Sequence, residues 1–210
     1  MGVQERRTRE KQARRRSVLD SARQLVLERG FNGATTKSIA ERCELSEATL
    51  FSYFLNKDEI LLSLLFEGID FTAAMLDEII AAELPPRERL ARTWKSYGKL
   101  NSEHPEYIHL FGYLARPRAT LNISAEVKSE IAKRSGDNFR RLAAILEGVV
   151  AAGNERVAAD LVWGAFIGIK TLKETRQNLG APAHPTEKEL ALVFDVLVMG
   201  LTGTGKKGGA

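Results

Sequence analysis

Apolar residues recur at helical spacing along most of this 210-residue chain. Near the N-terminus Val18, Ala22 and Leu25 follow one another at intervals of four and three residues, and Gly30 provides a natural stop. This pattern predicts a helix over about 8–29. Runs of alternating β-branched residues, the signal of a strand, are nearly absent. The sequence therefore predicts an all-α fold of about nine helices.

Capping and helix-breaking residues divide the rest of the pattern. Thr35 and Ser46 are suitable N-caps for two short helices that end near residues 43 and 54, and Asn56 is one for a long helix ending before Pro85. Five more helices are expected at 87–102, 105–115, 124–151, 155–178 and 186–200. Gly136-Asp137 marks a position where the helix 124–151 could kink or split.

Helix length suggests how the chain is organised. Three helices, two of them short, precede a body of long helices with apolar faces. We expect a small recognition module at 1–56 and a larger helical domain at 57–201. The tail 202–210 is rich in glycine and lysine and is expected to be disordered.

Composition narrows the class of protein. With 44% hydrophobic and 28% charged residues the chain has the balance of a soluble globular protein. A single cysteine excludes a disulfide scaffold and fits a reducing cytoplasm. No stretch approaches 18 consecutive apolar residues, and the N-terminus lacks the apolar run of a signal peptide. A cytoplasmic location is expected.

Charge is concentrated at the N-terminus. The net charge is +4, but residues 1–16 alone sum to +5, so the remainder of the chain is close to neutral. The basic residues of this segment are Arg6, Arg7, Arg9, Lys11, Arg14, Arg15 and Arg16. A cationic arm on a near-neutral body suits a polyanionic partner, nucleic acid before membrane. A solvated basic tail is the alternative.

The segment 35–57 reads TTKSIAERCELSEATLFSYFLNK. Two short helices are joined by the tight turn Cys43-Glu44-Leu45, and a serine opens the second. The apolar residues on both helices are spaced to form a small shared core: Ile39, Ala40, Leu45 and Leu50. This is the arrangement of a helix-turn-helix, whose second helix enters the major groove of DNA.

Positions in and around this segment also match a known family pattern in a single register. They are Gly30-Phe31, Thr35, Ile39-Ala40, Leu45-Ser46, Thr49-Leu50-Phe51-Ser52-Tyr53-Phe54 and Lys57. In this register the segment, over roughly residues 18–65, resembles the DNA-binding region of the TetR-type family of transcriptional regulators. The resemblance implies an N-terminal helix-turn-helix domain followed by a larger domain that binds an effector and dimerises.

The resemblance also implies roles for single residues. Thr35 would cap the second helix and face a phosphate, which Lys37 would also reach. Glu47, Ala48, Thr49 and Ser52 would lie on the side of the third helix that reads bases. Tyr53 and Lys57 would hold phosphates. Contacts to phosphates set the position on DNA, whereas contacts to base edges set the sequence.

Three departures from the family pattern affect this picture. Glu44 stands where the turn glycine is usual, and Phe51 replaces a tyrosine that would supply a hydroxyl. Glu47 places an acid at the head of the recognition helix, where it could accept a hydrogen bond from cytosine but would repel phosphates. The arginine-rich arm could offset these losses by releasing counterions, or could enter a minor groove.

A single helix-turn-helix makes few base contacts, so a homodimer on a palindromic operator is expected. Small and apolar residues on the last two helices suit a four-helix bundle between subunits: Leu161, Gly164, Ala165, Gly168, Val193, Phe194 and Leu197. Packing of these faces within one chain is the alternative.

The resemblance further implies a small apolar or aromatic effector. Candidate pocket residues are Trp94, Tyr97, Phe111, Tyr113 and Trp163, and a simple aromatic core is the alternative. Nucleophile, metal and phosphate-loop signatures are not recognised, so no enzyme activity, metal or cofactor is expected. We expect a repressor released from its operator by a ligand. The rival hypotheses are a DNA-binding protein that senses nothing, and a small-molecule-binding or catalytic helical protein whose basic arm is incidental.

Overall fold

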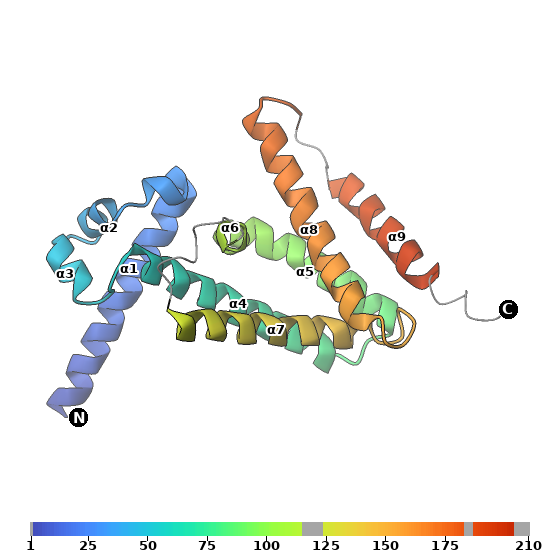
Figure 1. The fold of residues 1–210 in the computed structure, drawn as a ribbon, viewed down its shortest axis with the longest axis horizontal. Helices are drawn as coiled ribbons and strands as arrows, with labels where there is room; N and C mark the ends of the chain where they lie inside the picture. The colour runs from blue at the N-terminus through green and yellow to red at the C-terminus, as the bar shows by residue number, and fades with distance from the viewer. Residues whose placement is uncertain (1, 115–123, 183–186, 204–210) are drawn as a thin grey trace. The chain divides into compact units, whose positions relative to one another are not determined.

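The computed structural model describes residues 2–114, 124–182 and 187–203. Within these ranges the chain forms nine helices and no strand (Figure 1). They are α1 (Val3–Gly33), α2 (Thr36–Arg42), α3 (Glu47–Phe51), α4 (Lys57–Ala81), α5 (Pro86–Glu103), α6 (Pro105–Leu114), α7 (Ala125–Leu146), α8 (Glu155–Asn178) and α9 (Glu187–Gly203). The predicted all-α fold is confirmed. No helix in the described residues is both long and apolar enough to cross a membrane.

Most predicted boundaries hold within a few residues, and the exceptions have local causes. Helix α1 begins at Val3, earlier than expected. It is regular up to Gly30, whose φ of 67° interrupts the helix as predicted. The expected kink at Gly136-Asp137 is wrong, because α7 runs unbroken from Ala125 to Leu146. A glycine inside a helix costs only about 1 kcal/mol, which the neighbouring turns of a long helix can offset. The same helix ends before residue 151, since Gly148 adopts a φ of 77°.

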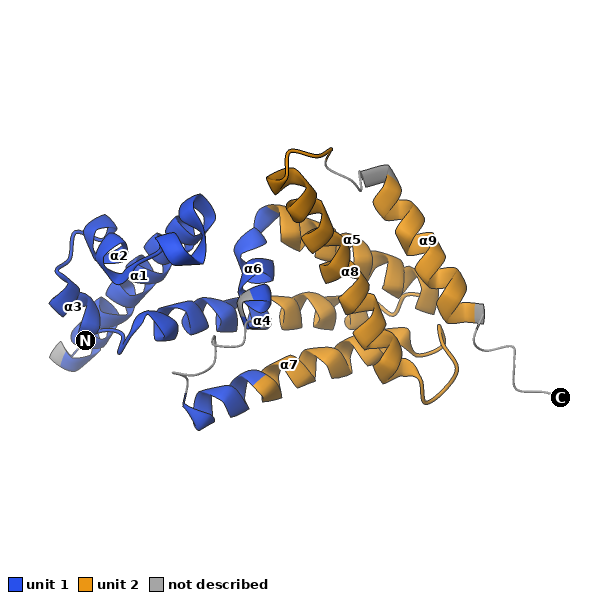
Figure 2. Cartoon of the chain, turned by 45° about the horizontal axis from the view of Figure 1, so that its top comes forward, with its two compact units in different colours: residues 1–70, 103–131 blue, residues 71–102, 132–210 orange. Residues whose placement is uncertain are grey.

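The chain divides into two compact units (Figure 2). Unit 1 comprises residues 1–70 and 103–131, and unit 2 comprises residues 71–102 and 132–210. Helix α4 therefore contributes its first part to one unit and its second part to the other. Helix α6 belongs with the three N-terminal helices in unit 1. The functional boundary predicted at residue 56 stays a prediction, and residues 204–210 of the predicted tail lie outside the described residues.

Unit 1 is built on the apolar face of α1. Val18, Ala22 and Leu25 are 0–1% exposed and belong to one cluster with residues of α2, α3, α4 and α6. Leu50 of α3 and Leu110 of α6 are buried in that cluster. Burying a leucine side chain completely stabilises a fold by about 1.5–3 kcal/mol. The short helix α3 is thus held in place by its contacts with the core rather than by its own five residues.

Candidate nucleic-acid interface

Side-chain caps define both helices of the helix-turn-helix. Thr35 Oγ1 accepts from the amide of Ser38 at 3.1 Å, and Ser38 Oγ accepts from the amide of Thr35 at 2.9 Å. This reciprocal pair is a capping box at the start of α2. Ser46 Oγ accepts from the amide of Thr49 at 3.1 Å and starts α3. Asn56 Oδ1 caps α4 in the same way, at 2.8 Å from the amide of Glu59. All three predicted caps are confirmed.

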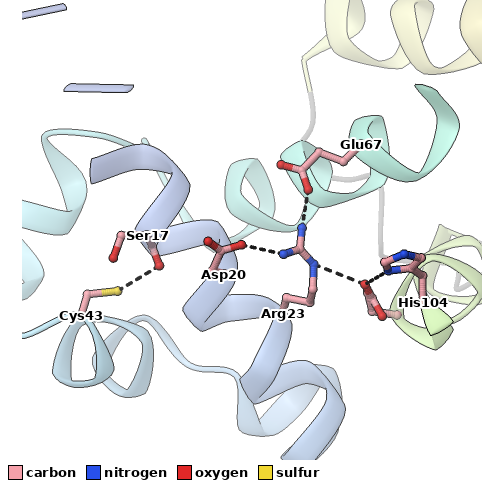
Figure 3. A network of polar contacts seen from close by, with 7 residues as sticks. Ser17, Asp20, Arg23, Cys43, Glu67 and His104 are labelled. Atoms are coloured by element: carbon pink, nitrogen blue, oxygen red, sulfur yellow. Dashed lines mark hydrogen bonds and ion pairs between the residues drawn. The ribbon is translucent and has the colours of Figure 1, made fainter. Parts of the chain in front are cut away.

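The turn between α2 and α3 is tight and left-handed. Glu44 has a φ of 58°, in the left-handed region that favours glycine. The turn is closed by the amide of Leu45, which donates to the carbonyl of Ala40 at 2.9 Å. The thiol of Cys43 donates to the carbonyl of Ser17 at 3.7 Å, which ties the turn to α1 (Figure 3). A left-handed non-glycine residue costs about 1–2 kcal/mol, and these contacts hold it in place.

The residues predicted to read bases are all exposed. Glu47, Ala48, Thr49 and Ser52 have exposed side chains, while Leu50 between them is 0% exposed. Phe54, which the sequence analysis did not place at the interface, is 2% exposed in the core. Helix α3 ends at Phe51, and Ser52 begins the turn that leads to α4. The helix therefore turns one buried face inward and leaves its polar residues available to a partner.

Several of these polar groups are already engaged within the chain. Thr36 Oγ1 donates to Glu47 Oε2 at 2.8 Å, so that the first residues of α2 and α3 are joined. Ser52 Oγ donates to the carbonyl of Thr49 at 2.7 Å, and the hydroxyls of Thr49 and Ser46 lie 2.8 Å apart. Sequence reasoning missed Thr36, since a bond between residues eleven positions apart depends on how the turn folds.

The residues predicted to hold phosphates differ in their exposure and in their contacts within the chain. Thr35 and Lys37 are exposed. Tyr53 is half-buried and packs against the core of unit 1. Lys57 is also half-buried, and its Nζ donates to the carbonyl of Phe31. Burial lowers the pKa of Lys57. A lysine ammonium has three donors, so this bond leaves two for another acceptor.

The comparisons with known proteins bear on this geometry. The sequence profile of bacterial regulatory proteins of the tetR family matches residues 18–64, the stretch that contains all three caps and the left-handed turn. Residues 18–64, less than a quarter of the chain, therefore form a TetR-type segment.

Relatives among curated proteins agree over the same region. The TetR-type segment is 38% identical over 61 residues to the helix-turn-helix transcriptional regulator YvkB of Bacillus subtilis, which is 29% of this chain and 32% of that protein. It is 28% identical over 74 residues to the fatty acid metabolism regulator protein of the same organism, 35% of this chain and 38% of that protein. The chain thus matches only about a third of the length of these relatives.

Solved structures extend the likeness to the fold of the whole chain. A TetR/AcrR regulator from Thermobifida fusca has a TM-score of 0.65 at 19% identity, covering 90% of this chain and 98% of that one. FadR of Bacillus subtilis, solved with stearoyl-CoA, has a TM-score of 0.65 at 18% identity, covering 90% and 97%. AibR, solved with isovaleryl-CoA and operator DNA, has a TM-score of 0.63 at 19% identity, covering 90% and 98%. The first two of these proteins are named as transcriptional regulators.

One arginine of the basic segment has a structural position in the TetR-type fold. The guanidinium of Arg15 lies 4.0 Å above the ring of Phe54, and its Nη1 donates to the carbonyl of Tyr53. Its Nη2 lies 3.4 Å from Glu59 Oε1. Arg15 therefore ties α1 to the connection between α3 and α4. The other six basic residues of the segment have exposed side chains.

A second cluster joins α1, α4 and α6 within unit 1 (Figure 3). Arg23 bonds Asp20 at 2.6 Å, pairs with Glu67, and lies 3.3 Å from Glu106 Oε1. Glu106 is 1% exposed, and His104 Nδ1 lies 3.5 Å from the same oxygen. Burial alone would lower the pKa of Arg23, but the nearby acids, Glu67 foremost, raise it. Sequence patterns did not signal this cluster, because its members are far apart along the chain.

The predicted pocket residues fall into different parts of the TetR-type fold. Trp94, Tyr97 and Trp163 lie in unit 2. The rings of Tyr97 and Trp163 are 5.1 Å apart and meet edge to face, and Phe166 lies between 5.4 and 6.1 Å from all three rings. Burial raises the pKa of Tyr97. Phe111 packs instead against the core of unit 1, and the side chain of Tyr113 lies outside the described residues.

The predicted dimer residues also divide. Leu161, Gly164 and Gly168 are exposed on α8, whereas Ala165, Val193 and Leu197 are half-buried. Phe194 is half-buried too, and its ring lies 6.0 Å from that of Trp94. The large apolar side chains exposed on these two helices are Val157, Leu161, Leu172, Leu192, Val196 and Met199. On α9 the exposed large apolar residues are thus Leu192, Val196 and Met199, which lie beside the predicted interface residues. The interface itself stays a prediction.

Proposed function

We propose that this protein is a homodimeric, sequence-specific DNA-binding regulator that represses transcription in the cytoplasm. The observation that carries the proposal is the geometry of α3. It is capped by Ser46, held from beneath by Leu50, and exposes Glu47, Ala48, Thr49 and Ser52. A helix held this way can enter a major groove with its N-terminal residues toward the base edges.

A dimer would present two such helices to one palindrome. Two recognition helices must lie about 34–36 Å apart to enter successive major grooves on one face of DNA. The exposed large apolar side chains of α8 and α9 support dimerisation, because a dimer interface would remove them from water. AibR was solved with operator DNA, which gives the proposal a precedent in a protein of the same fold.

Release by a small molecule is the finer part of the proposal. FadR and AibR were solved with acyl-CoA molecules, and Trp94, Tyr97 and Trp163 of unit 2 are the residues beside which we propose that a small apolar or aromatic effector binds. A ligand can release DNA only by binding the DNA-incompetent state more tightly. Helix α4 enters both units, so it is the element through which we expect the two sites to be coupled.

Selection of fragments of the source genome on the purified protein, followed by footprinting, tests DNA recognition. We expect one enriched palindrome protected over both half-sites. The variants Thr49→Ala and Ser52→Ala should change the preferred bases, whereas Lys37→Gln should weaken binding to every duplex alike. Binding that shows no sequence preference in the unchanged protein would overturn the proposal.

Titration of the operator complex with stearoyl-CoA and isovaleryl-CoA tests release. The affinity for the operator should fall when the protein is saturated with at least one of these two compounds. Free coenzyme A, which lacks an acyl chain, is the control. Equal affinities with and without either compound would favour a second candidate, a regulator that senses no ligand. The mutual packing of Trp94, Tyr97, Trp163 and Phe166 supports that candidate, since rings in contact fill the space that a ligand would need.

A further inference from the structure

The N-terminal part of α1 is a helix with little of its surface covered. Residues 4–17 are exposed except for Arg15, which is half-buried, and Val18 is the first core residue. From Val3 to Val18 the helix rises about 22 Å at 1.5 Å per residue. The basic segment is therefore a rod continuous with the core of unit 1.

The basic residues of this rod fall on two faces. Arg7, Lys11 and Arg14 continue the row of Val18, Ala22 and Leu25 at intervals of four and three residues, so they share its face. We call these three residues the basic row. Arg6, Arg9 and Arg16 lie on the other side of the helix.

The two acidic residues of the segment form their contacts outside the basic row. Glu10 Oε1 pairs with Arg6 Nε at 3.1 Å, on the other face. Glu5 Oε2 accepts from the amide of Gly2 at 3.0 Å. Glu10 lies three residues after Arg7 and four before Arg14, within reach of the edge of the basic row, but the ion pair that it forms is with Arg6. The basic row thus carries three positive charges beside one carboxylate, and that carboxylate is paired with Arg6 of the opposite face.

Arg15 places the basic row beside the helix-turn-helix. It lies next to Arg14 in the chain and contacts the carbonyl of Tyr53 and the ring of Phe54, directly after α3. Phosphates that flank the bases read by α3 are therefore the polyanion nearest to the basic row in a DNA complex.

We propose that Arg7, Lys11 and Arg14 form a rigid surface that binds consecutive phosphates of DNA beside the bases read by α3. This inference rests on the proposed function. Arg7 and Arg14 are about 10 Å apart along the helix, and phosphates of one strand are spaced about 3.4 Å along the DNA axis, so the basic row spans about three phosphates. A helix about 10–12 Å wide does not fit the minor groove of about 6 Å, which excludes the expected alternative of an arm inserted there.

Two triple variants with the same change in charge test the proposal. R7Q/K11Q/R14Q removes the basic row, and R6Q/R9Q/R16Q removes the opposite face. Binding to a duplex of random sequence is measured by fluorescence anisotropy over a series of KCl concentrations. Each phosphate contact contributes about 0.9 to the slope of log affinity against log salt, so the first variant should lower the slope by about 2–3 and the second by less than about 1. Equal decreases of the slope in both variants would mean that the segment binds DNA without a preferred face, and would overturn the inference.

The variant Ala13→Pro tests rigidity with every charge retained. Proline removes the hydrogen bond to residue 9 and breaks the rod between Lys11 and Arg14. Because residues 4–13 lie outside the core, helix α1 should stay folded from Val18 onward, and circular dichroism checks this. Ala13→Pro should lower the slope by at least 1, and a slope equal to that of the unchanged protein would overturn a rigid surface. If the unchanged protein binds no duplex, the proposed function itself has failed.

Discussion

Single residues of the turn decide how the recognition helix is held. Glu44 occupies a left-handed position without the freedom of glycine, and Glu47 is fixed by Thr36 from the neighbouring helix. The sequence alone indicated the first feature, because the family pattern has glycine at that position. It could not indicate the second, because the bond exists only once the turn brings two helix starts together.

Glu44→Gly should stabilise the protein. Removing Cβ relieves a penalty of about 1–2 kcal/mol, and the greater freedom of unfolded glycine offsets about 0.5–1 kcal/mol, which leaves a gain of about 0.5–1 kcal/mol. Urea denaturation measures the free energy of unfolding. Glu41→Gly, three residues earlier inside α2, is the matched control and should lose stability instead. Similar losses from both variants would contradict the strain at Glu44.

Thr36→Val should weaken the preference for particular bases that we expect Glu47 to set. Valine keeps the shape of threonine but leaves the carboxylate without its donor, so Glu47 is free to swing away from the base edge. A good base contact contributes about 1–3 kcal/mol of discrimination. Thr36→Val should lose part of the preference at one base pair of each half-site, and Glu47→Gln all of it. Affinities for operators substituted at each position measure this, and unchanged preferences in both variants would exclude Glu47 as a base reader.

At the scale of helices, local signals predicted more than long-range ones. The caps at Thr35, Ser46 and Asn56 act within three residues, so the sequence revealed them correctly. The sequence could not indicate which apolar residues of α9 are exposed in the single chain, because this depends on how Phe194 packs against Trp94, and the predicted interface stays a prediction. Arg15 looked like one more charge of the basic arm, and only the folded chain brings it onto Phe54.

Arg23→Met should be strongly destabilising, because it leaves Glu106 buried without its cation. Breaking a buried ion pair by removing one partner costs about 3–5 kcal/mol. The double variant Arg23→Met with Glu106→Leu should recover most of that loss, since the carboxylates that then lack a cation, Asp20 and Glu67, are exposed to solvent rather than buried. Chemical denaturation of the two variants and the unchanged protein gives the comparison. A double variant as unstable as the single one would show that the cluster matters for packing rather than charge.

At the scale of the whole molecule, the exposed rows of α8 and α9 predict how the protein assembles. Leu161→Glu and Val196→Glu should each shift the dimer toward monomer in sedimentation equilibrium and weaken binding to a palindrome more than to a half-site. Leu27→Glu, on α1 of unit 1, changes an exposed leucine in the same way and should leave assembly unchanged. Dimers that persist in both α8 and α9 variants would contradict an interface on these rows.

Unit 1 is made of two separate stretches of sequence, 1–70 and 103–131. A hybrid regulator that takes its DNA specificity from another protein cannot simply exchange the N-terminal segment. The incoming α1 would have to supply an arginine for the resident Glu106 and an apolar surface for the resident Leu110. The operator specificity proposed for α3 would therefore be transplanted together with α6, or by replacing the exposed residues of α3 one at a time.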